Sequence, residues 1–151
     1  MSGERDLDTL RREMAPQLHP ETFVYCSFPD FRIPPGLEPI CTFREAEGVT
    51  AIVEKAQADD FAVPYAFESH LITLTVHSAL DAVGFIAMLT GRLADADIPC
   101  NVVAGYHHDH LFVPLTFHVP TAKHRGNPWH FARGLAREVT LKAPPATRPP
   151  A

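Results

Sequence analysis

Four side chains that can take part in chemistry are adjacent in one short segment: His107, His108, Asp109 and His110. Imidazole and carboxylate groups bind transition metals and act as general bases. The apolar residues on either side predict a β-hairpin, in which neighbouring side chains point to opposite faces. His108 and His110 would then share one face, and His107 and Asp109 the other. Because two ligands are too few for a metal site, we expect turn and hydrogen-bonding roles here.

An enzyme using these histidines would need further groups. His70 or His77 on a neighbouring strand would have to complete a metal set, and a general base would need an oriented partner that the sequence does not identify. The motifs of serine nucleophiles, zinc-binding helices and phosphate loops are absent from the sequence. We therefore expect no catalytic residue, no metal and no cofactor. A metal-dependent hydrolase built on His77, His108 and His110 is kept as the less favoured alternative.

A second candidate site joins a predicted strand to a predicted helix. Unpaired backbone N–H groups and the positive end of the helix dipole favour a carboxylate at such a place. Ser78 is a suitable N-cap, and Asp81 on the first turn can hold an ammonium group. It is equally open that Ser78 is only a cap and that Asp81 only offsets the helix dipole. The candidate ligand-binding residues of this segment are His77, Ser78, Ala79, Leu80 and Asp81.

The elements that position this second site have the clearest patterns in the chain. The segment from His70 to His77 alternates apolar and polar residues, which predicts a strand. A helix opening at Ser78 and ending before Pro99 would follow. Its apolar residues recur at spacings of three and four, and they are Ala82, Ile86, Leu89, Leu93 and Ala96. A hairpin of residues 100–106 and 111–113 across the histidine turn would complete most of a βαββαβ unit.

The first half of the chain predicts a degenerate or permuted copy of the same layout. A short amphipathic helix over 8–14 precedes a strand rich in aromatic and β-branched residues over 22–28. A proline-rich loop leads to two strands, 39–44 and 49–54, and Gly48 between them can adopt a positive φ. One or two helical turns over 55–62 would close this half.

Composition bounds the class of protein. The chain has 151 residues, of which 46% are hydrophobic and 21% charged, as in a globular domain or two very small ones. A net charge of −5 without a basic stripe argues against nucleic acid as a partner. The apolar runs are shorter than the roughly 20 residues of a membrane span, and the charged N-terminus has no secretory signal, so we expect a cytoplasmic protein. Cys26, Cys41 and Cys100 lie in apolar segments and are expected in the core.

Four sequence blocks resemble a small bacterial family of tandem ACT-domain proteins. These blocks are residues 18–26, 43–50, 74–84, and 100–106 together with 108–114, in the same order as in the family. A more distant similarity links the chain to the ACT modules of aspartate kinases and of the arginine-sensing CASTOR proteins. Four blocks over about two-thirds of the chain form a more specific match than any single short motif.

The resemblance implies an α+β fold of two ACT-like, ferredoxin-like βαββαβ subdomains, with antiparallel sheets and helices on one face. We expect these at 1–64 and 65–114, with a divergent tail over 115–151. The closing helix of the second subdomain would be displaced to 128–140, unless a shifted reading frame has left an unrelated tail.

The resemblance also implies a small-molecule-binding regulatory protein rather than an enzyme. ACT modules seat amino acids at the segment from His77 to Asp81 and against the strand that carries Asn101. The Asn101 amide both donates and accepts hydrogen bonds, as recognition of an amino acid requires. A homodimer is expected. The alternative of a different class is an assembly module that pairs through an exposed sheet edge.

Overall fold

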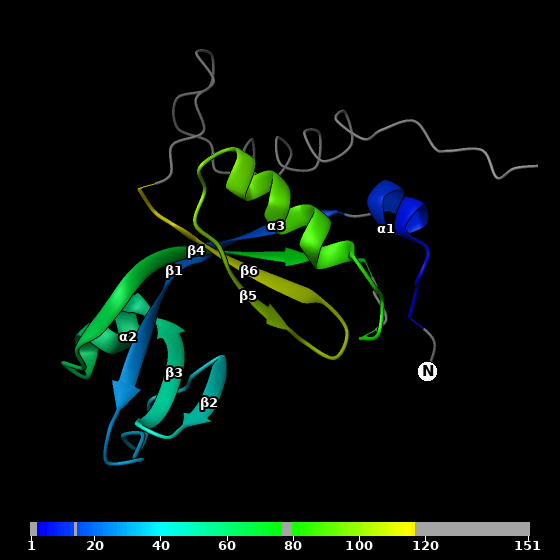
Figure 1. Ribbon diagram of the computed structural model, residues 1–151. Coiled ribbons are helices and arrows are strands. Elements are labelled where there is room, and N and C mark those ends of the chain that lie inside the picture. Colours follow the sequence, from blue (N-terminus) through cyan, green and yellow to red (C-terminus); the bar gives the residue numbers. More distant parts are fainter. Residues whose placement is uncertain (1–2, 14, 77–79, 117–151) are drawn as a thin grey trace, which may run out of the picture.

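The computed structural model describes residues 3–13, 15–76 and 80–116 (Figure 1). This part of the chain forms one antiparallel sheet with three helices. The elements are α1 (Leu7–Glu13), β1 (Pro16–Phe28), β2 (Cys41–Glu45), β3 (Gly48–Glu54), α2 (Lys55–Asp60), β4 (Tyr65–Leu74), α3 (Phe85–Asp95), β5 (Asn101–Ala104) and β6 (Asp109–Pro114). None of the described helices has the length and apolar character needed to cross a membrane.

The six strands follow the order β2-β3-β1-β4-β6-β5, and every neighbouring pair is antiparallel. The two halves of the chain therefore share a continuous sheet, which β1 and β4 join at its centre. Leu18 of β1 pairs with Ile72 of β4, and Thr22 pairs with His70, so β1 carries extra residues between these two points. The irregularity increases the local twist and helps the sheet to curl. The predicted α+β class with antiparallel strands is confirmed.

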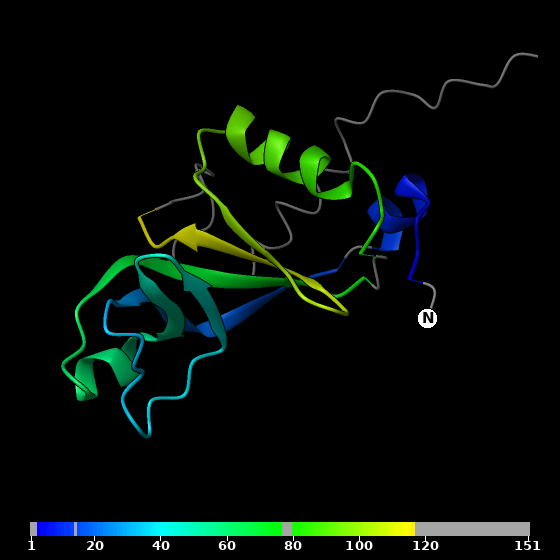
Figure 2. The ribbon, with the colours of Figure 1, turned by 60° about the horizontal axis from the view of Figure 1, so that its bottom comes forward.

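The helices cover one face of the sheet, as predicted. Side chains alternate along β1, so that Leu18, Val24 and Cys26 lie on the same side. Leu18 belongs to the apolar cluster beneath α3, whereas Val24 and Cys26 pack with Ala58 of α2. Figures 1 and 2 show α3 lying across β4, β6 and β5. The opposite face carries no helix among the described residues.

Gly48 opens β3 directly after the turn that follows β2, where its φ is +148°. A Cβ atom at this position would stand 2.4 Å from the backbone oxygen of Phe28. Glycine is thus required by both conformation and space, which confirms the predicted role of this residue in the hairpin.

The helix after β4 begins later than the sequence predicted. α3 starts at Phe85, and Leu80 and Asp81 lie in a turn before it. Ser78 is outside the described residues, but the predicted helix is wrong at Leu80 and Asp81, which are not helical. The cause is Gly84, whose φ of +91° is left-handed and interrupts a right-handed helical path.

The apolar stripe of α3 is shorter than predicted. Leu89 and Leu93 are buried and Ile86 is half-buried, as expected, but Ala96 follows the helix and is exposed. Phe85 is buried at the start of the helix instead. The helix expected over 128–140 lies outside the described residues, as does most of the tail.

Leu89→Ala should destabilise the protein by about 2 to 5 kcal/mol, because the side chain is fully buried against the cluster that holds Ile72 and Leu74. Urea unfolding followed by circular dichroism measures this loss. Asp95→Ala, exposed in the last turn of α3, should stay within about 0.5 kcal/mol of the parent. An equally small loss for Leu89→Ala would show that the stripe has been assigned to the wrong face.

Candidate functional site

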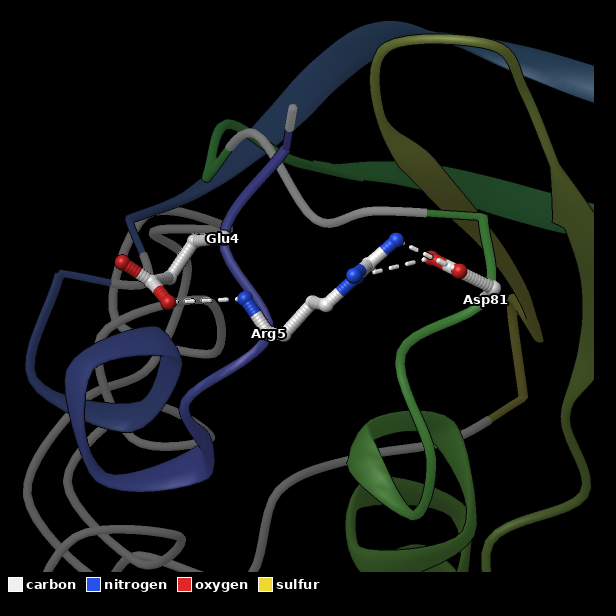
Figure 3. Close-up of polar contacts among 3 residues, drawn as sticks. All are labelled: Glu4, Arg5 and Asp81. Atoms are coloured by element: carbon white, nitrogen blue, oxygen red, sulfur yellow. Dashed lines mark hydrogen bonds and ion pairs between the residues drawn. The ribbon is translucent and has the colours of Figure 1, made fainter. Parts of the chain in front are cut away.

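An ion pair joins the N-terminal segment to the turn before α3 (Figure 3). The Arg5 guanidinium donates from Nε to Asp81 Oδ1 at 3.1 Å and from Nη2 to Oδ2 at 2.6 Å. Both side chains are 68% exposed. Glu4 Oε1 accepts from the backbone N–H of Arg5 at 2.7 Å and so fixes the chain beside it. Asp81 was predicted from its place at the start of an expected helix, but Arg5 was not, because nothing local links positions 76 residues apart.

The start of α3 lies a few residues after this ion pair. The N-cap residue is Gly84, which has no side chain to accept hydrogen bonds from the first turn. The Met88 N–H is bonded to the Gly84 oxygen at 2.9 Å, whereas the N–H groups before it have no intrahelical acceptor. These donors and the helix dipole favour an anion at this end of α3.

The structure brings together only part of the predicted ligand-binding set. Leu80 and Asp81 are exposed in the turn, while His77, Ser78 and Ala79 lie outside the described residues. Asn101 opens β5 opposite Phe112, which in turn pairs with Leu71. Asn101 is therefore level with the middle of β4 rather than with its end, and the structure does not bring it to Asp81.

The histidine turn forms the predicted hairpin between β5 and β6. Asp109 is buried on the helix-covered face, and His110 follows it on the opposite face, which matches the expected alternation. His108 lies near the turn after β4, with Nδ1 3.4 Å from the backbone oxygen of Val76. Within the described ranges, no three His, Cys, Asp or Glu side chains are placed to hold a metal together. The absence of a metal from the protein stays a prediction.

On the helix-free face, one threonine connects two histidines. Thr73 Oγ1 lies 2.9 Å from His19 Nε2 and 3.0 Å from His110 Nδ1. A hydroxyl has one proton, so it donates to one ring and accepts from the other when both imidazoles are neutral. Burial lowers the pKa of His110, the neighbouring His108 and His19 lower it further, and Asp109 opposes them.

A pocket of about 330 Å³ opens beside this network. Every strand of the sheet lines it or ends beside it, which reflects the curl of the sheet around this face. Its lining comprises His19, Glu21, Phe23, Ile40, Cys41, Glu54, Leu71, Thr73, Val103, His110 and Phe112. No local sequence pattern predicted this pocket. The available signal was a set of polar residues at alternate positions within otherwise apolar strands.

The cysteines occupy different environments. Cys26 is buried as predicted, and burial raises its pKa. Cys41 is half-buried and lines the pocket. Cys100 is half-buried at the edge of the apolar cluster beneath α3, and burial raises its pKa to about 11. Nearby, burial raises the pKa of Tyr25 to about 12, and its hydroxyl is buried without a hydrogen-bond partner among the described residues.

The fold and its tandem arrangement agree with a known domain class. ACT-domain profiles match the sequence twice, over residues 2–70 and over 66–117. ACT domains are typically regulatory, ligand-binding modules. The chain belongs to the ACT-domain family, and the predicted resemblance is confirmed.

Solved structures support the same class. The chain is similar to a Vibrio cholerae protein of unknown function, described as a possible transport protein, with 34% identity, a TM-score of 0.69, and coverage of 91% of this chain and 98% of the other. A protein from Agrobacterium tumefaciens has 14% identity, a TM-score of 0.59, and coverage of 84% and 89%. Aspartokinase α and β subunits share the fold at 9% identity, with a TM-score of 0.52 and coverage of 83% and 96%. A search of curated proteins finds no match.

Stability should decrease as the pH falls below about 6.5, because two histidines resist protonation in the folded state. Burial lowers the pKa of both His70 and His110 below the ordinary 6.5, so the unfolded chain takes up protons first. Their contribution is complete above pH 6.5 and is lost as the pH falls toward the folded pKa values. Urea unfolding between pH 5 and 8 measures this slope.

His110→Asn keeps a polar atom near the position of Nδ1 but cannot titrate, so it should reduce the pH dependence. The slope that remains in this variant should fall again when His70→Asn is added. An unchanged slope in the double variant would contradict the role of these two imidazoles.

Proposed function

We propose that the protein is a regulatory sensor that binds an amino acid at the turn before α3. The observation that carries the proposal is the Arg5–Asp81 pair, which presents both charges beside a helix start without a side-chain cap. The proposed site extends over the candidate residues His77, Ser78, Ala79, Leu80 and Asp81.

An amino acid carries one ammonium and one carboxylate, so it complements this turn in both charges. The Asp81 carboxylate suits the α-ammonium group, and the Arg5 guanidinium with the first N–H groups of α3 suits the α-carboxylate. Because Arg5 and Asp81 are mostly exposed, their mutual ion pair contributes little to stability. A ligand can therefore replace it with two new charge pairs at low cost.

We infer that the protein regulates rather than catalyses, and that it needs no cofactor. Membership of the ACT family supports a regulatory role. We also propose that it works in the cytoplasm, where free thiols such as Cys26, Cys41 and Cys100 persist. The subdomains proposed at 1–64 and 65–114 would each supply one half of the sheet.

Calorimetry should detect the proposed ligand. A thermal-shift screen of the twenty amino acids first identifies it, because a ligand at 100 times its dissociation constant stabilises the folded state by about 2.7 kcal/mol. Asp81→Asn and Arg5→Gln should then each weaken binding by roughly ten- to a hundredfold, since each removes a charged hydrogen-bond partner.

Asn101→Ala serves as the control and should leave the affinity unchanged. Asn101 lies at the level of Leu71, within the sheet and before the end of β4, whereas the proposed site is at the turn before α3. If no amino acid raises the unfolding temperature, the ligand class is wrong. Parental affinity in both charge variants would move the site away from this turn.

We further propose that the protein acts as a homodimer through an edge of the sheet. β2 and β5 are the edge strands, and Phe43 of β2 leaves 68% of its surface exposed. Light scattering during gel filtration should give twice the mass of one chain. Phe43→Lys should shift the mass toward one chain if β2 forms the contact. A monomeric parent at micromolar concentration would contradict the proposal.

A further inference from the structure

We propose that the pocket on the helix-free face is a second binding site, which takes a small apolar molecule carrying a protonated amine. It lies on the opposite face of the sheet from α3 and the proposed amino-acid site. Its volume of about 330 Å³ falls at the lower end of the range for small-molecule pockets.

The inner wall of the pocket is apolar. Phe23, Leu71 and Phe112 are 3%, 6% and 1% exposed, although no described helix covers them. The rings of Phe23 and Phe112 meet edge to face, with their centroids 6.2 Å apart. The curl of the sheet shields this cluster from solvent, and the cluster forms an apolar floor that a small apolar or aromatic body can contact.

The ionisable side chains of the wall select for a cation. Glu21 and Glu54 contribute carboxylates from β1 and β3, and the lining contains no lysine or arginine. Neither carboxylate has an ion pair with another described residue. An ammonium group near them gains two favourable charge interactions, whereas a carboxylate would meet two like charges. Because the α-carboxylate of a free amino acid would meet these like charges, the pattern favours an amine without an acid group.

The His19–Thr73–His110 network adds two imidazole rings, joined through one hydroxyl, to the wall of the pocket. When both imidazoles are neutral, the Thr73 hydroxyl donates its single proton to one ring and accepts a hydrogen bond from the N–H of the other. One ring then has its second nitrogen as an acceptor and the other has an N–H donor. Thr73 is only 7% exposed, and its hydroxyl holds both rings on the wall of the pocket that Glu21 and Glu54 also line. An ammonium group can donate to the accepting nitrogen, and the N–H of the other ring is left to a different acceptor.

The test uses 2-phenylethylamine as the probe, with phenylacetate and 2-phenylethanol as matched anionic and neutral compounds. Titrations of the full chain are followed by calorimetry and by amide chemical shifts. The amine should bind and shift the amides of Leu71, Thr73, His110 and Phe112. The neutral alcohol should bind at least tenfold more weakly, and the acid should not bind.

The double variant Glu21→Gln with Glu54→Gln should weaken amine binding by more than tenfold, since each carboxylate is replaced by a neutral side chain of the same shape. Its matched control is Glu47→Gln with Glu68→Gln, two exposed carboxylates outside the pocket, which should bind like the parent.

Three results would overturn the proposal. The first is equal binding of the amine, the acid and the alcohol, which would mean that the carboxylates select nothing. The second is the absence of amide shifts in β4 and β6 at millimolar amine. The third is a response confined to residues 80–87, which would assign the amine to the turn before α3. All three are read on the parent protein, so they hold even if a variant fails to fold.

Discussion

Pairing between β1 and β4 is the interaction on which the rest of the structure depends. These two strands stand at the centre of the sheet, and each carries a separate group of strands on its outer side. Their register sets Leu18 opposite Ile72 and Thr22 opposite His70. Because side chains alternate along a strand, this single register decides which residues reach the helices and which reach the helix-free face. The pocket on the helix-free face takes its residues from β1 and β4 as this register sets them.

The two faces of the sheet have acquired different chemistry. Apolar residues of the helix-covered face form a closed core in which Leu74, Phe85 and Leu89 are essentially inaccessible. On the helix-free face, the curl of the sheet shields Phe23 and Phe112 but leaves charged and imidazole groups around them. A sheet with one covered face is a stable platform, and its other face is free to specialise in recognition.

Local sequence patterns predicted most of the elements but only part of the sites. Sequence patterns located the hairpins, the last five residues of β4 and the buried Leu89 and Leu93 of α3, because each signal lies within one element. The strand predicted over 70–77 begins earlier and ends earlier, at Tyr65 and Leu74. The late start of α3 depends on the backbone of Gly84, and an apolar stripe does not report a backbone angle. The helix-free pocket depends on long-range pairing, since Thr73 is 54 positions from His19 and 37 from His110. No spacing rule connects such residues before the strand order is known.

The double role of β1 also restricts how this protein can evolve. Leu18, Val24, Cys26 and Phe28 serve the helix-side core, while Phe23 and Tyr25 serve the other face. Deleting one residue in the middle of the strand would exchange these two sets and expose both clusters at once. Insertions and deletions should therefore be absent from the stretch between Thr22 and Phe28 in natural homologues. The loop from Pro29 to Pro39 can change in length at its exposed positions, but Leu37 within it is buried in the helix-side core. Substitution, rather than change of length, is the route by which β1 can adapt to new ligands.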